Sequence, residues 1–331
     1  MKLAIVEGDG IGKEVIPVAV DVLDALSLSI EKVPLELGYG KWERTGSAIT
    51  DEDLSILKEC DCILFGAITT PPDPNYKSVL LTIRKELDLY ANIRPVRPIP
   101  GITGVTGRSD FDIMIVRENT EGMYSGIEEV HHDVAYTRRV ITRKGSERIA
   151  RAACELAETR NRHLTIVHKS NVLKSDTLFL DACRDVAASY DITYNDMLVD
   201  AMAYSLISSP QQYDVVVTTN LFGDILSDMA AALVGGLGIV PSANIGDNRA
   251  FFEPVHGSAP DIAGQGIANP LATILSVKMM LEWLGDHQDA ALIEESMCYA
   301  ISQNIITPDL GGLANTRQVG DALVDCIMHT N

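Results

Sequence analysis

Two aspartates four positions apart are the first residues whose type and spacing suggest chemistry. Asp224 and Asp228 lie in segment 220–228, between the apolar runs 213–219 and 229–234. An apolar run that leads into helical spacing and then into two glycines predicts a buried strand followed by a helix. On that helix the carboxylates share one face, one turn apart. Paired carboxylate oxygens suit Mg²⁺ or Mn²⁺, although solvated carboxylates near a helix start would explain them too.

Basic residues are informative because the chain is acidic. It has 27 Lys and Arg against 46 Asp and Glu, a formal net charge of −19. Arg84, Arg94 and Arg117 lie on a predicted helix, on the extended segment after it and at the end of a predicted strand. Three guanidinium groups could clamp a di- or tricarboxylate, because their forked donors match carboxylates bidentately. Surface ion pairing is the alternative for each arginine.

A lysine and a glycine-containing run add two further candidates. Lys169 follows the strand-like run 164–167 and could act as a base if it is partly removed from water, whereas a solvated lysine would have no such role. In residues 252–264 small residues permit close backbone approach, and Asp261 could accept ribose hydroxyls, although a plain loop is equally consistent.

The N-terminal glycines give a weaker dinucleotide signal. They stand at positions 8, 10 and 12, and Lys13 stands where the third glycine of the dinucleotide fingerprint would be. We interpret them as a turn that joins a strand to a helix.

Composition excludes several kinds of partner. The negative charge argues against non-specific nucleic-acid binding and against an anionic membrane surface. The sequence shows neither an 18-residue apolar run nor a signal-peptide pattern, which predicts a cytoplasmic protein. Six scattered cysteines argue against a zinc site and for reduced thiols.

Strands and helices are predicted to alternate, which indicates an α/β fold with much parallel pairing. At 331 residues, two domains or one large α/β domain are expected. Prolines at 95, 98 and 100 suggest a domain boundary, residues 133–142 a β-like arm, and residues 235–247 a glycine-rich loop. Predicted strands are 3–6, 62–65, 111–116, 164–167 and 213–219; predicted helices are 13–26, 51–59, 78–87, 146–158, 176–189, 270–284 and 290–301.

Together these segments resemble the β-decarboxylating dehydrogenases, the family of isocitrate, isopropylmalate and homoisocitrate dehydrogenases. The resemblance runs from residue 7 to residue 312, and its motifs are Arg-Glu-Asn-Thr-Glu-Gly-Met-Tyr at 117–124, the segment 220–228 and the segment 253–264. It implies a homodimer and an isopropylmalate/isocitrate dehydrogenase-like two-domain fold with a central cleft and a non-Rossmann dinucleotide site. Residues 1–95 and 240–331 would form the large, cofactor-binding domain. Residues 96–239 would form the small domain, with the dimer interface and a clasp arm at about 127–145.

The resemblance also assigns roles in the chemistry. Asp224 and Asp228 match metal ligands, and Asp200 matches a third ligand donated by the partner subunit. Lys169 matches a base supplied across the dimer, and Tyr124 matches the tyrosine that protonates carbon after CO₂ leaves. The bound Mg²⁺ or Mn²⁺ would acidify the substrate hydroxyl and stabilise the enolate. Arg84, Arg94 and Arg117 match carboxylate-binding arginines.

The resemblance implies NAD as the cofactor. NADP-using members carry a lysine and a tyrosine where this chain has Asp261 and Ile262, and a carboxylate there would repel a 2′-phosphate. The implied cofactor-binding residues are Glu253, His256, Gly257, Ser258, Ala259, Pro260, Asp261, Ile262 and Asn269.

Substrate choice is expected to depend on Lys77, Ser78, Leu80 and Leu81, before Arg84. Lys77 and Ser78 could serve a third carboxylate, and the leucines suit an isopropyl group or a methylene chain. We favour a homoisocitrate-type substrate over 3-isopropylmalate, with isocitrate as a further alternative. A non-catalytic metal-binding α/β protein is the alternative class.

Overall fold

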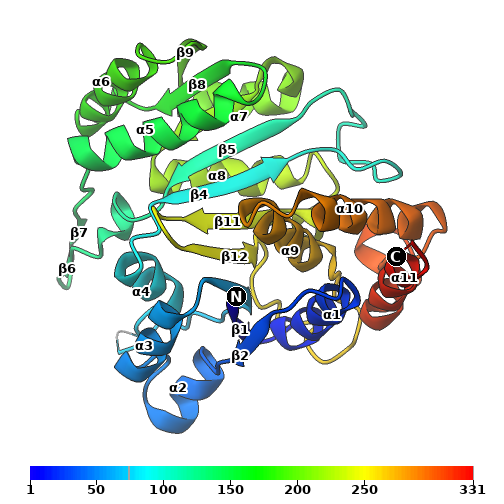
Figure 1. Cartoon of the computed structure of the whole chain (residues 1–331). Helices are drawn as coiled ribbons and strands as arrows, with labels where there is room; N and C mark the ends of the chain where they lie inside the picture. The colour runs from blue at the N-terminus through cyan, green and yellow to red at the C-terminus, as the bar shows by residue number, and fades with distance from the viewer. Residues whose placement is uncertain (74, 331) are drawn as a thin grey trace.

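The structure is a computed structural model that describes residues 1–73 and 75–330. Its strands are β1 (Lys2–Gly8), β2 (Glu31–Pro34), β3 (Cys62–Ala67), β4 (Ala91–Val96), β5 (Ile113–Glu118), β6 (Glu128–Val130), β7 (Ala135–Thr137), β8 (His163–His168), β9 (Thr193–Leu198), β10 (Val215–Thr218), β11 (Pro241–Ile245) and β12 (Ala250–Pro254). A ten-stranded sheet has the order β2-β1-β3-β12-β11-β4-β5-β10-β8-β9, and β6 pairs with β7 separately (Figure 1).

Helices cover both faces of this sheet (Figure 1). They are α1 (Gly12–Ala25), α2 (Tyr39–Thr45), α3 (Asp51–Glu59), α4 (Val79–Glu86), α5 (Arg143–Glu158), α6 (Ser175–Ala187), α7 (Val199–Ser208), α8 (Asn220–Ala231), α9 (Leu271–Trp283), α10 (His287–Ser302) and α11 (Thr316–Thr330). Short 3₁₀ turns are η1 (Met123–Ser125), η2 (Pro210–Gln212), η3 (Leu237–Ile239) and η4 (Pro308–Leu310).

The sheet is parallel toward both ends and antiparallel in the middle. At one end β2, β1, β3 and β12 are parallel neighbours, and at the other β5, β10, β8 and β9 are. The three pairs between them, β12 with β11, β11 with β4 and β4 with β5, are antiparallel. Helical crossovers produce the parallel ends. The predicted α/β class is therefore confirmed, while the antiparallel middle was not predicted.

One predicted loop was wrong, and a segment for which a plain loop was an open alternative is a loop only in part. Residues 235–247, expected to be a glycine-rich loop, contain η3 and the buried strand β11. The run that begins at residue 252 starts inside β12, whose residues are all buried. In both segments local composition is loop-like, but each backbone finds a hydrogen-bonded neighbour in the sheet. Helices α2 and α11 and strands β2, β9 and β12 had also not been predicted.

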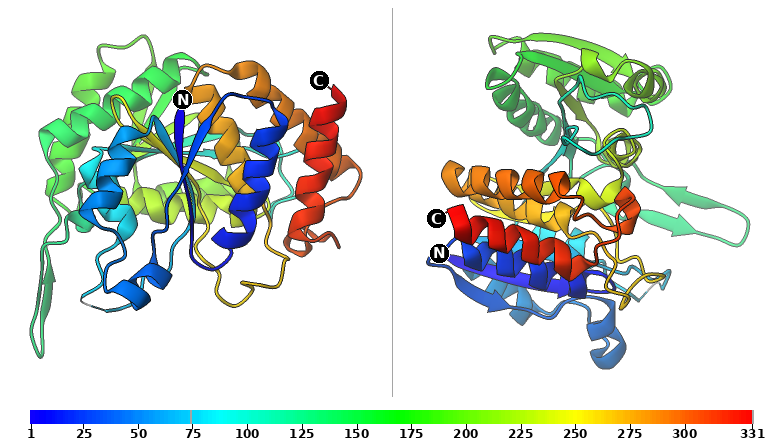
Figure 2. Two further views of the ribbon diagram at one scale, coloured as in Figure 1. Left: turned by 60° about the horizontal axis from the view of Figure 1, so that its bottom comes forward. Right: turned by 90° about the vertical axis from the view of Figure 1, so that its right-hand side faces the viewer.

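Hydrophobic side chains form one large core and smaller clusters around it. The largest cluster packs α1, α9, α10 and α11 against the sheet. Figure 2 shows α11 lying beside α1, although the two helices come from opposite ends of the chain. A second cluster packs α5 and α6 on β5, β8 and β10, and a third lies under α3 and α4. Each cluster covers a different part of the sheet, and the hydrogen-bonded sheet connects the three clusters.

The β-like arm expected at residues 133–142 is present as a hairpin. β6 and β7 pair from Glu128↔Thr137 to Val130↔Ala135, and all residues of both strands are exposed. Figure 2 shows the hairpin extending away from the rest of the chain. Val130 and Tyr136 are exposed by 77% and 57%, which is unusual for large apolar side chains and indicates a surface that another chain could cover.

The N-terminal glycine turn packs closely on a distant segment. Gly10 has a φ of +55°, and a Cβ there would lie 2.0 Å from the Ser258 carbonyl oxygen. The Ile11 N–H donates to that oxygen at 2.9 Å. Asp9 between the glycines is buried, and its carboxylate accepts the N–H groups of Tyr39, Gly40 and Thr69 at 2.8, 2.9 and 3.1 Å. The turn therefore joins three segments that follow it in the chain.

Two further observations concern the whole chain. Among the described residues, no helix combines the length and the apolar character needed to cross a bilayer. All six cysteines are free thiols, and burial raises the pKa of Cys62 and of Cys154 to about 12. These two thiols are consequently poor nucleophiles.

The start of α3 gives a test of local stability. Thr50 and Asp53 form a reciprocal capping box, and Lys41 donates to the Asp53 carboxylate at 2.5 Å. Burial alone would raise the pKa of Asp53, but Lys41 and the Thr50 N–H outweigh it and lower the pKa. Asp53→Ala should cost about 1–2 kcal/mol at pH 7, and the difference from the parent should shrink below about pH 4, as Asp53 becomes protonated.

Urea unfolding between pH 7 and pH 3 measures this effect. The matched control is Asp51→Ala, which removes an exposed carboxylate from the same helical turn. If both variants lose the same stability at every pH, the capping box and the Lys41 contact are not the cause.

Candidate active site

The predicted arginines meet on one face of the antiparallel middle of the sheet. Asn92 of β4 pairs with Arg117 of β5, and Arg94 follows Asn92 by two positions, so all three side chains leave the sheet on the same side. Helix α8 lies over this side (Figure 1). It approaches closely because residue 223 is glycine, since a Cβ there would lie 2.6 Å from the Arg117 Cβ.

A cleft of about 330 Å³ opens beside these strands. The predicted site residues that line it are Ser78, Leu80, Leu81, Arg84, Arg94, Arg117, Tyr124, Asp224, Glu253, His256 and Gly257. Gly66, Ala67 and Ile68 at the end of β3 also line it, as do Thr70, Pro254 and Val255, which we did not predict. Segments far apart in the sequence are thus brought to one cavity.

Two arginines hold the acidic face of α8. Arg117 donates through Nη1 to Asp224 Oδ1, and Arg94 Nη1 lies 3.5 Å from the same oxygen. Arg94 also donates to Asp228 at 3.2 Å and to Ser227 Oγ at 2.7 Å. The predicted sharing of one helical face by the two aspartates is confirmed, because Arg94 contacts both.

Arg84 and Glu253 form a second buried ion pair in the cleft. Arg84 Nη2 donates to Glu253 Oε1 at 2.9 Å, and both side chains are less than a tenth exposed. Asn244 donates to the same oxygen at 2.8 Å. Arg84 Nε is buried without a hydrogen-bond partner in the described structure. Arg84 thus lines the cleft with one buried donor that is unpaired, which leaves it with hydrogen-bonding capacity that its own chain does not use.

A set of buried amides supports the arginines and was not predicted. Asn220 accepts from Arg117 Nε and Nη2 at 3.0 and 2.8 Å, and Asn92 accepts from Arg94 Nε at 2.7 Å. Asn92 in turn donates to Ser242 and Asn244. Alternation along β4 would have placed Asn92 beside Arg94, but its partners on β11 depend on the order of strands.

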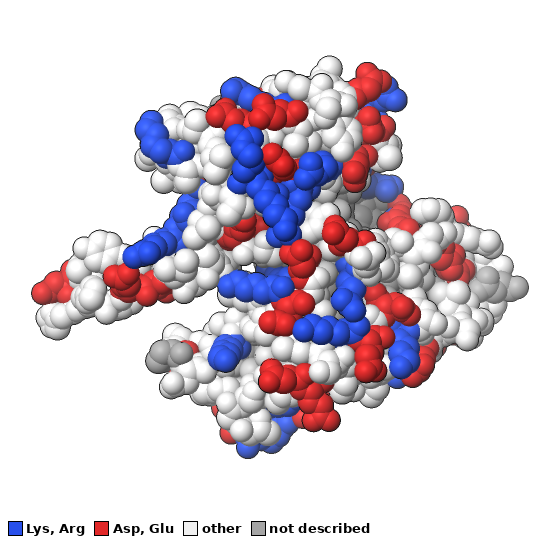
Figure 3. All heavy atoms as spheres, turned by 60° about the vertical axis from the view of Figure 1, so that its left-hand side comes forward, with Lys and Arg blue, Asp and Glu red and all other residues white. Residues whose placement is uncertain are grey.

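Burial and the closeness of the arginines to one another affect the pKa values at this site. Burial lowers the pKa of Arg94 and of Arg117, and the arginines lower it further by mutual repulsion. Desolvated, mutually repelling cations attract anions strongly. Figure 3 shows basic and acidic side chains side by side around the hollow below the part that carries the arm, so the acidic excess of the chain does not make this face purely negative.

The two aspartates of α8 differ in acidity. Burial alone would raise the pKa of Asp224, but Arg117, Arg94 and the Tyr124 hydroxyl hold it below its usual value. Burial raises the pKa of Asp228 in spite of Arg94, and the charge of Asp224 adds to the rise. The Asp224 and Asp228 side chains are 34% and 53% exposed, and Asp224 lines the cleft whereas Asp228, one turn further along α8, does not.

Tyr124 is held against α8 through its hydroxyl group. Its hydroxyl donates to Asp224 Oδ2 at 2.6 Å, and the Arg117 guanidinium lies 5.3 Å from its ring centroid. Burial, followed by the hydrogen bond to Asp224, raises the pKa of Tyr124. The phenol is therefore neutral at physiological pH.

The N-terminus of α4 separates the predicted substrate residues. Ser78 is its N-cap and lines the cleft together with Leu80 and Leu81. Lys77, one residue earlier, is exposed and is not among the residues that line the cleft. The position of the Lys77 side chain therefore does not support the expectation that it binds a third substrate carboxylate in the cleft of its own chain.

Lys169 and Asp200 lie outside the cleft of their own chain. Lys169 follows β8, Asp200 is in the first turn of α7, and the two side chains form an ion pair. Asp200 is 66% exposed, and its hydrogen bond with Lys169 lowers its pKa. The structure brings these two predicted residues to each other but not to Asp224.

The segment after β12 is fixed to the N-terminal turn. Ser258 Oγ lies 2.7 Å from Thr69 Oγ1, and the Glu14 carboxylate accepts the N–H groups of Gly264 and Gly266 at 2.5 and 2.8 Å. Asp261 between these anchors is exposed. Glu14 was not predicted, because nothing local shows that α1 reaches a segment 250 residues later.

The remaining predicted cofactor residues surround this segment. Burial lowers the pKa of His256, whose Nε2 is out of water without a partner in the described residues. Asn269 donates to Asp309 at 3.0 Å. Gly257 and Pro260 are exposed, while Ala259 and Ile262 are half-buried. The His256 Nδ1 lies 3.0 Å from the Gly257 carbonyl oxygen, so only Nε2 of this imidazole is left for a hydrogen-bonding ligand.

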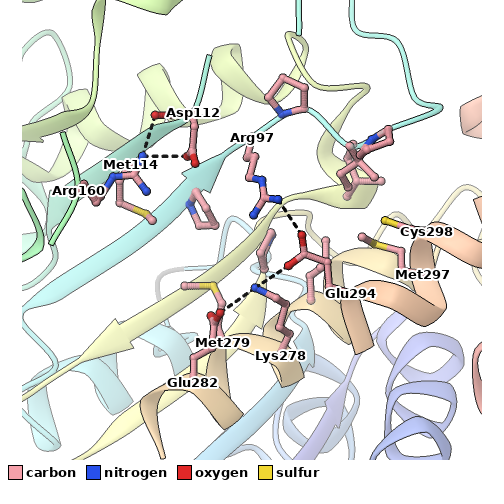
Figure 4. A pocket seen from close by; sticks show the side chains of 17 residues that line it. Arg97, Asp112, Met114, Arg160, Lys278, Met279, Glu282, Glu294, Met297 and Cys298 are labelled. Carbon is pink, nitrogen blue, oxygen red and sulfur yellow. Dashed lines mark hydrogen bonds and ion pairs between the residues drawn. The ribbon is translucent and has the colours of Figure 1, made fainter. Parts of the chain in front are cut away.

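A second cavity lies on the opposite face of β4 (Figure 4). It has a volume of about 220 Å³, and none of the predicted site residues lines it. Its charged side chains pair with each other: Arg97 with Glu294 at 2.8 Å, Lys278 with Glu282 at 2.8 Å and Arg160 with Asp112 at 2.9 Å. Mutual pairing leaves no free charge to recognise a substrate, so we place the chemistry in the first cleft.

Comparison with known proteins identifies the family. A sequence model described as isocitrate/isopropylmalate dehydrogenase matches residues 2–323. The homoisocitrate dehydrogenase of Methanocaldococcus jannaschii is 48% identical over 340 residues, covering 99% of this chain and 98% of that protein. The 3-isopropylmalate/3-methylmalate dehydrogenase of the same organism is 48% identical over 329 residues, covering 97% of each.

A solved structure agrees with the sequence relatives. The crystal structure of isocitrate dehydrogenase from Methylococcus capsulatus matches with a TM-score of 0.95 at 42% identity and covers 99% of both chains. These three similar proteins carry different substrate names, so they agree on the class of enzyme and not on one substrate. The family and its fold, expected from the motifs, are confirmed: the chain belongs to the isocitrate/isopropylmalate dehydrogenase family and is a dehydrogenase of that family.

Proposed function

We propose that this enzyme catalyses the NAD- and metal-dependent oxidative decarboxylation of a 3-substituted malate, with a homoisocitrate-type substrate favoured. One observation carries the proposal: Arg84, Arg94 and Arg117 line one cleft together with Asp224. The arginines can bind the carboxylates of a substrate, and the neighbouring aspartate can bind a divalent metal ion. A hydroxy acid that chelates a metal requires both kinds of group in one place.

The three arginines would bind and orient the substrate carboxylates. Arg94 and Arg117 are almost completely buried, and Arg84 keeps an unpaired Nε. Their side chains are fixed by Asn92, Asn220 and Glu253, so little conformational entropy is lost on binding. Fixed donors on the leaving carboxylate orient its bond for cleavage without binding it so tightly that departure is opposed.

Asp224 and Asp228 fit a Mg²⁺ or Mn²⁺ ion in type and spacing. Both are oxygen ligands on one helical face and both are partly exposed. Among the described residues, no group of three Asp, Glu, His or Cys side chains within this single chain is arranged to hold a metal. The third ligand, Asp200, is proposed to come from a second copy of the chain. When bound, the ion would supply Lewis-acid chemistry at the substrate hydroxyl and carbonyl oxygen.

Two side chains would move protons. Lys169 of a second subunit would remove the proton of the substrate hydroxyl as hydride passes to the nicotinamide. Tyr124 would then deliver its proton to the carbon that CO₂ has left, which its neutral phenol allows. The exposed segment that contains Asp261 would bind the adenosine part of NAD.

A homodimer with shared active sites is part of this proposal. Lys169 and Asp200 lie outside their own cleft and have exposed fractions of 24% and 66%. Apolar side chains near them on α7 and α8 are also exposed, with Tyr204 at 76% and Ile225 at 58%. We propose that residues 96–239 form the interface domain, that the β6–β7 arm clasps the partner, that residues 1–95 and 240–331 bind the cofactor, and that the enzyme is cytoplasmic.

Substrate preference depends on the start of α4. Ser78 lines the cleft and could donate to a distal carboxylate, which favours homoisocitrate. Leu80 and Leu81 also line it and suit either the isopropyl group of 3-isopropylmalate or a methylene chain. One relative at 48% identity is named homoisocitrate dehydrogenase and another at 48% is named 3-isopropylmalate/3-methylmalate dehydrogenase, so these names do not separate the two choices. Because Lys77 is exposed, the proposed preference depends on Ser78.

A substrate panel tests the proposed reaction. Homoisocitrate, 3-isopropylmalate, isocitrate and malate are each supplied with Mn²⁺ and NAD or NADP, and the reduced cofactor is followed by absorbance. We expect homoisocitrate with NAD to give the highest kcat/KM. Ser78→Ala should reduce kcat/KM for homoisocitrate about tenfold relative to 3-isopropylmalate, because a hydrogen bond to a charged group is lost.

Two outcomes would contradict this prediction. A hundredfold preference for 3-isopropylmalate would make the substrate assignment wrong, and no turnover of any panel member would favour the non-catalytic alternative. Lys77→Ala serves as the neighbouring control, and we expect it to change each kcat/KM by less than about twofold, as for an exposed side chain.

The cofactor preference has its own test. Asp261→Lys combined with Ile262→Tyr should move the ratio of kcat/KM for NADP to that for NAD by at least about tenfold toward NADP, because a repulsive carboxylate is replaced by a cation. Gln265→Lys, which adds a charge to the same segment, is the control. An unchanged ratio in the double variant would remove Asp261 from the account of cofactor choice.

Metal binding can be measured without turnover. At 100 times its Kd, Mn²⁺ should stabilise the wild-type protein by about 2.7 kcal/mol and raise its Tm. Asp224→Asn should abolish this shift, because a charged ligand is lost. Asp191→Asn, which neutralises an exposed carboxylate paired with Arg162, should keep it. An undiminished shift in Asp224→Asn would exclude Asp224 as a ligand.

A further inference from the structure

A buried ion pair outside the cleft has no part in the chemistry described above. Asp176, the second residue of α6, has no exposed surface, and the Arg139 side chain, on the segment that returns from the arm, is 12% exposed. Neither residue lines the cleft. The pair joins segments that the proposed function uses for different tasks.

Asp176 fixes the backbone of Lys169. One carboxylate oxygen accepts from Arg139 Nη1, and the other accepts the Lys169 N–H at 2.7 Å. On the other side of the residue, the Lys169 carbonyl oxygen accepts the Leu173 N–H at 2.8 Å. The position of the Lys169 backbone is therefore determined on both sides, and one of the two supports is a buried charge.

Arg139 extends the link to the start of α8. It donates to Ser175 Oγ and to Thr219 Oγ1, each at 2.9 Å, and its guanidinium lies 5.3 Å from the Phe222 ring centroid. Thr219 directly precedes α8, and its side chain makes no capping hydrogen bond there. The Thr219 hydroxyl therefore forms its hydrogen bond with Arg139 and not with the first turn of α8.

A buried ion pair of this kind permits little variation in geometry. Both charges are removed from water, and only well-aligned partners compensate the loss of hydration. Here both carboxylate oxygens of Asp176 are used, and both terminal nitrogens of Arg139 donate. A shift of the Lys169 loop relative to α8 would break at least one of these bonds in a low-dielectric environment, where the loss is large.

We propose that Arg139 and Asp176 are positioning residues that set the Lys169 loop relative to the helix carrying Asp224 and Asp228. This rests on the proposed function, in which Lys169 is the base and α8 binds the metal. In the proposed dimer, Lys169 serves the partner's cleft while α8 serves its own. The ion pair of Arg139 and Asp176 would then connect Lys169, which acts in the partner's cleft, with α8, which binds the metal in the chain's own cleft.

The same half of the molecule contains a matched control pair. Arg160 donates to Asp214 at 2.8 Å, their side chains are 17% and 4% exposed, and Asp214 also accepts a backbone N–H, that of His163, at 3.4 Å. Arg160 precedes β8 and Asp214 precedes β10, whereas Lys169 follows β8. The control pair therefore lies at the opposite end of these parallel strands from Lys169. Its removal should cost comparable stability without disturbing the site.

The test compares Asp176→Asn and Arg139→Lys with Asp214→Asn and Arg160→Lys. Each full-length variant is assayed with NAD, Mn²⁺ and the substrate that the wild-type enzyme oxidises best. The first two should lower kcat about 10- to 100-fold, with KM for substrate and NAD within about twofold, because a misplaced base impairs the chemical step. They should also change the pH profile of kcat. The control variants should lower the urea midpoint but leave kcat and its pH profile unchanged.

A double-variant comparison separates positioning from stability. In a Lys169→Ala background, Asp176→Asn should lower kcat no further, whereas independent effects would multiply. Thr219→Val removes the bond to α8 and keeps the ion pair, so it reports on the link even if Asp176→Asn fails to fold, and it should lower kcat several-fold.

Each outcome has a defined meaning. Wild-type kcat in Arg139→Lys and Thr219→Val, with unfolding midpoints that fall as in the controls, would overturn the proposal and make the pair purely structural. If Lys169→Ala itself retains wild-type kcat, the proposed role of Lys169 is wrong, and the inference is lost together with it. Loss of activity in Lys169→Ala alone, with normal kcat in the other variants, would leave the proposed function intact and reject only the positioning role.

Discussion

The contacts of Arg94 and Arg117 with Asp224 are the interaction on which the rest of the site depends. Two guanidinium groups are buried on adjacent strands, and burial of unpaired cations would strongly destabilise the fold. Helix α8 supplies the compensating carboxylates, and Gly223 lets it approach closely enough to do so. The site is therefore part of the reason why α8 packs on β4 and β5, and the fold cannot be separated from its charges.

Much of the site could be predicted because its signals are local. The spacing of Asp224 and Asp228, the apolar run before them and the position of Arg117 at a strand end are all visible within short segments. Partners from distant segments were not visible in this way. Asn220 and Arg117 are 103 positions apart, and Asn92 and Asn244 are 152 apart. Such pairs depend on strand order, which local periodicity does not determine.

Two expectations that the structure did not support have identifiable physical causes. β11 is preceded by glycines and begins with proline, so it resembles a loop, but β4 and β12 on either side supply its hydrogen bonds and bury it. Lys77 and Ser78 are neighbours before α4, yet one is exposed and the other lines the cleft, because the N-cap fixes which side chain turns inward. Tertiary neighbours thus decided the first case against local composition, and the local cap geometry decided the second.

The charges also suggest how substrate and metal would depend on each other. Asp224 pairs with Arg117 and Arg94 through one carboxylate oxygen and accepts from Tyr124 through the other, so both of its oxygens are engaged, while Asp228 supplies a second negative charge beside Arg94. A substrate carboxylate that binds these arginines would take over this neutralisation and weaken the hold on Asp224. Asp224 would then be freer to bind a divalent cation, whose charge offsets the carboxylates now gathered there. Because binding free energies are reciprocal, the metal would in turn strengthen the binding of the substrate. The same ion cluster that holds α8 on the sheet would thus make the two ligands bind cooperatively.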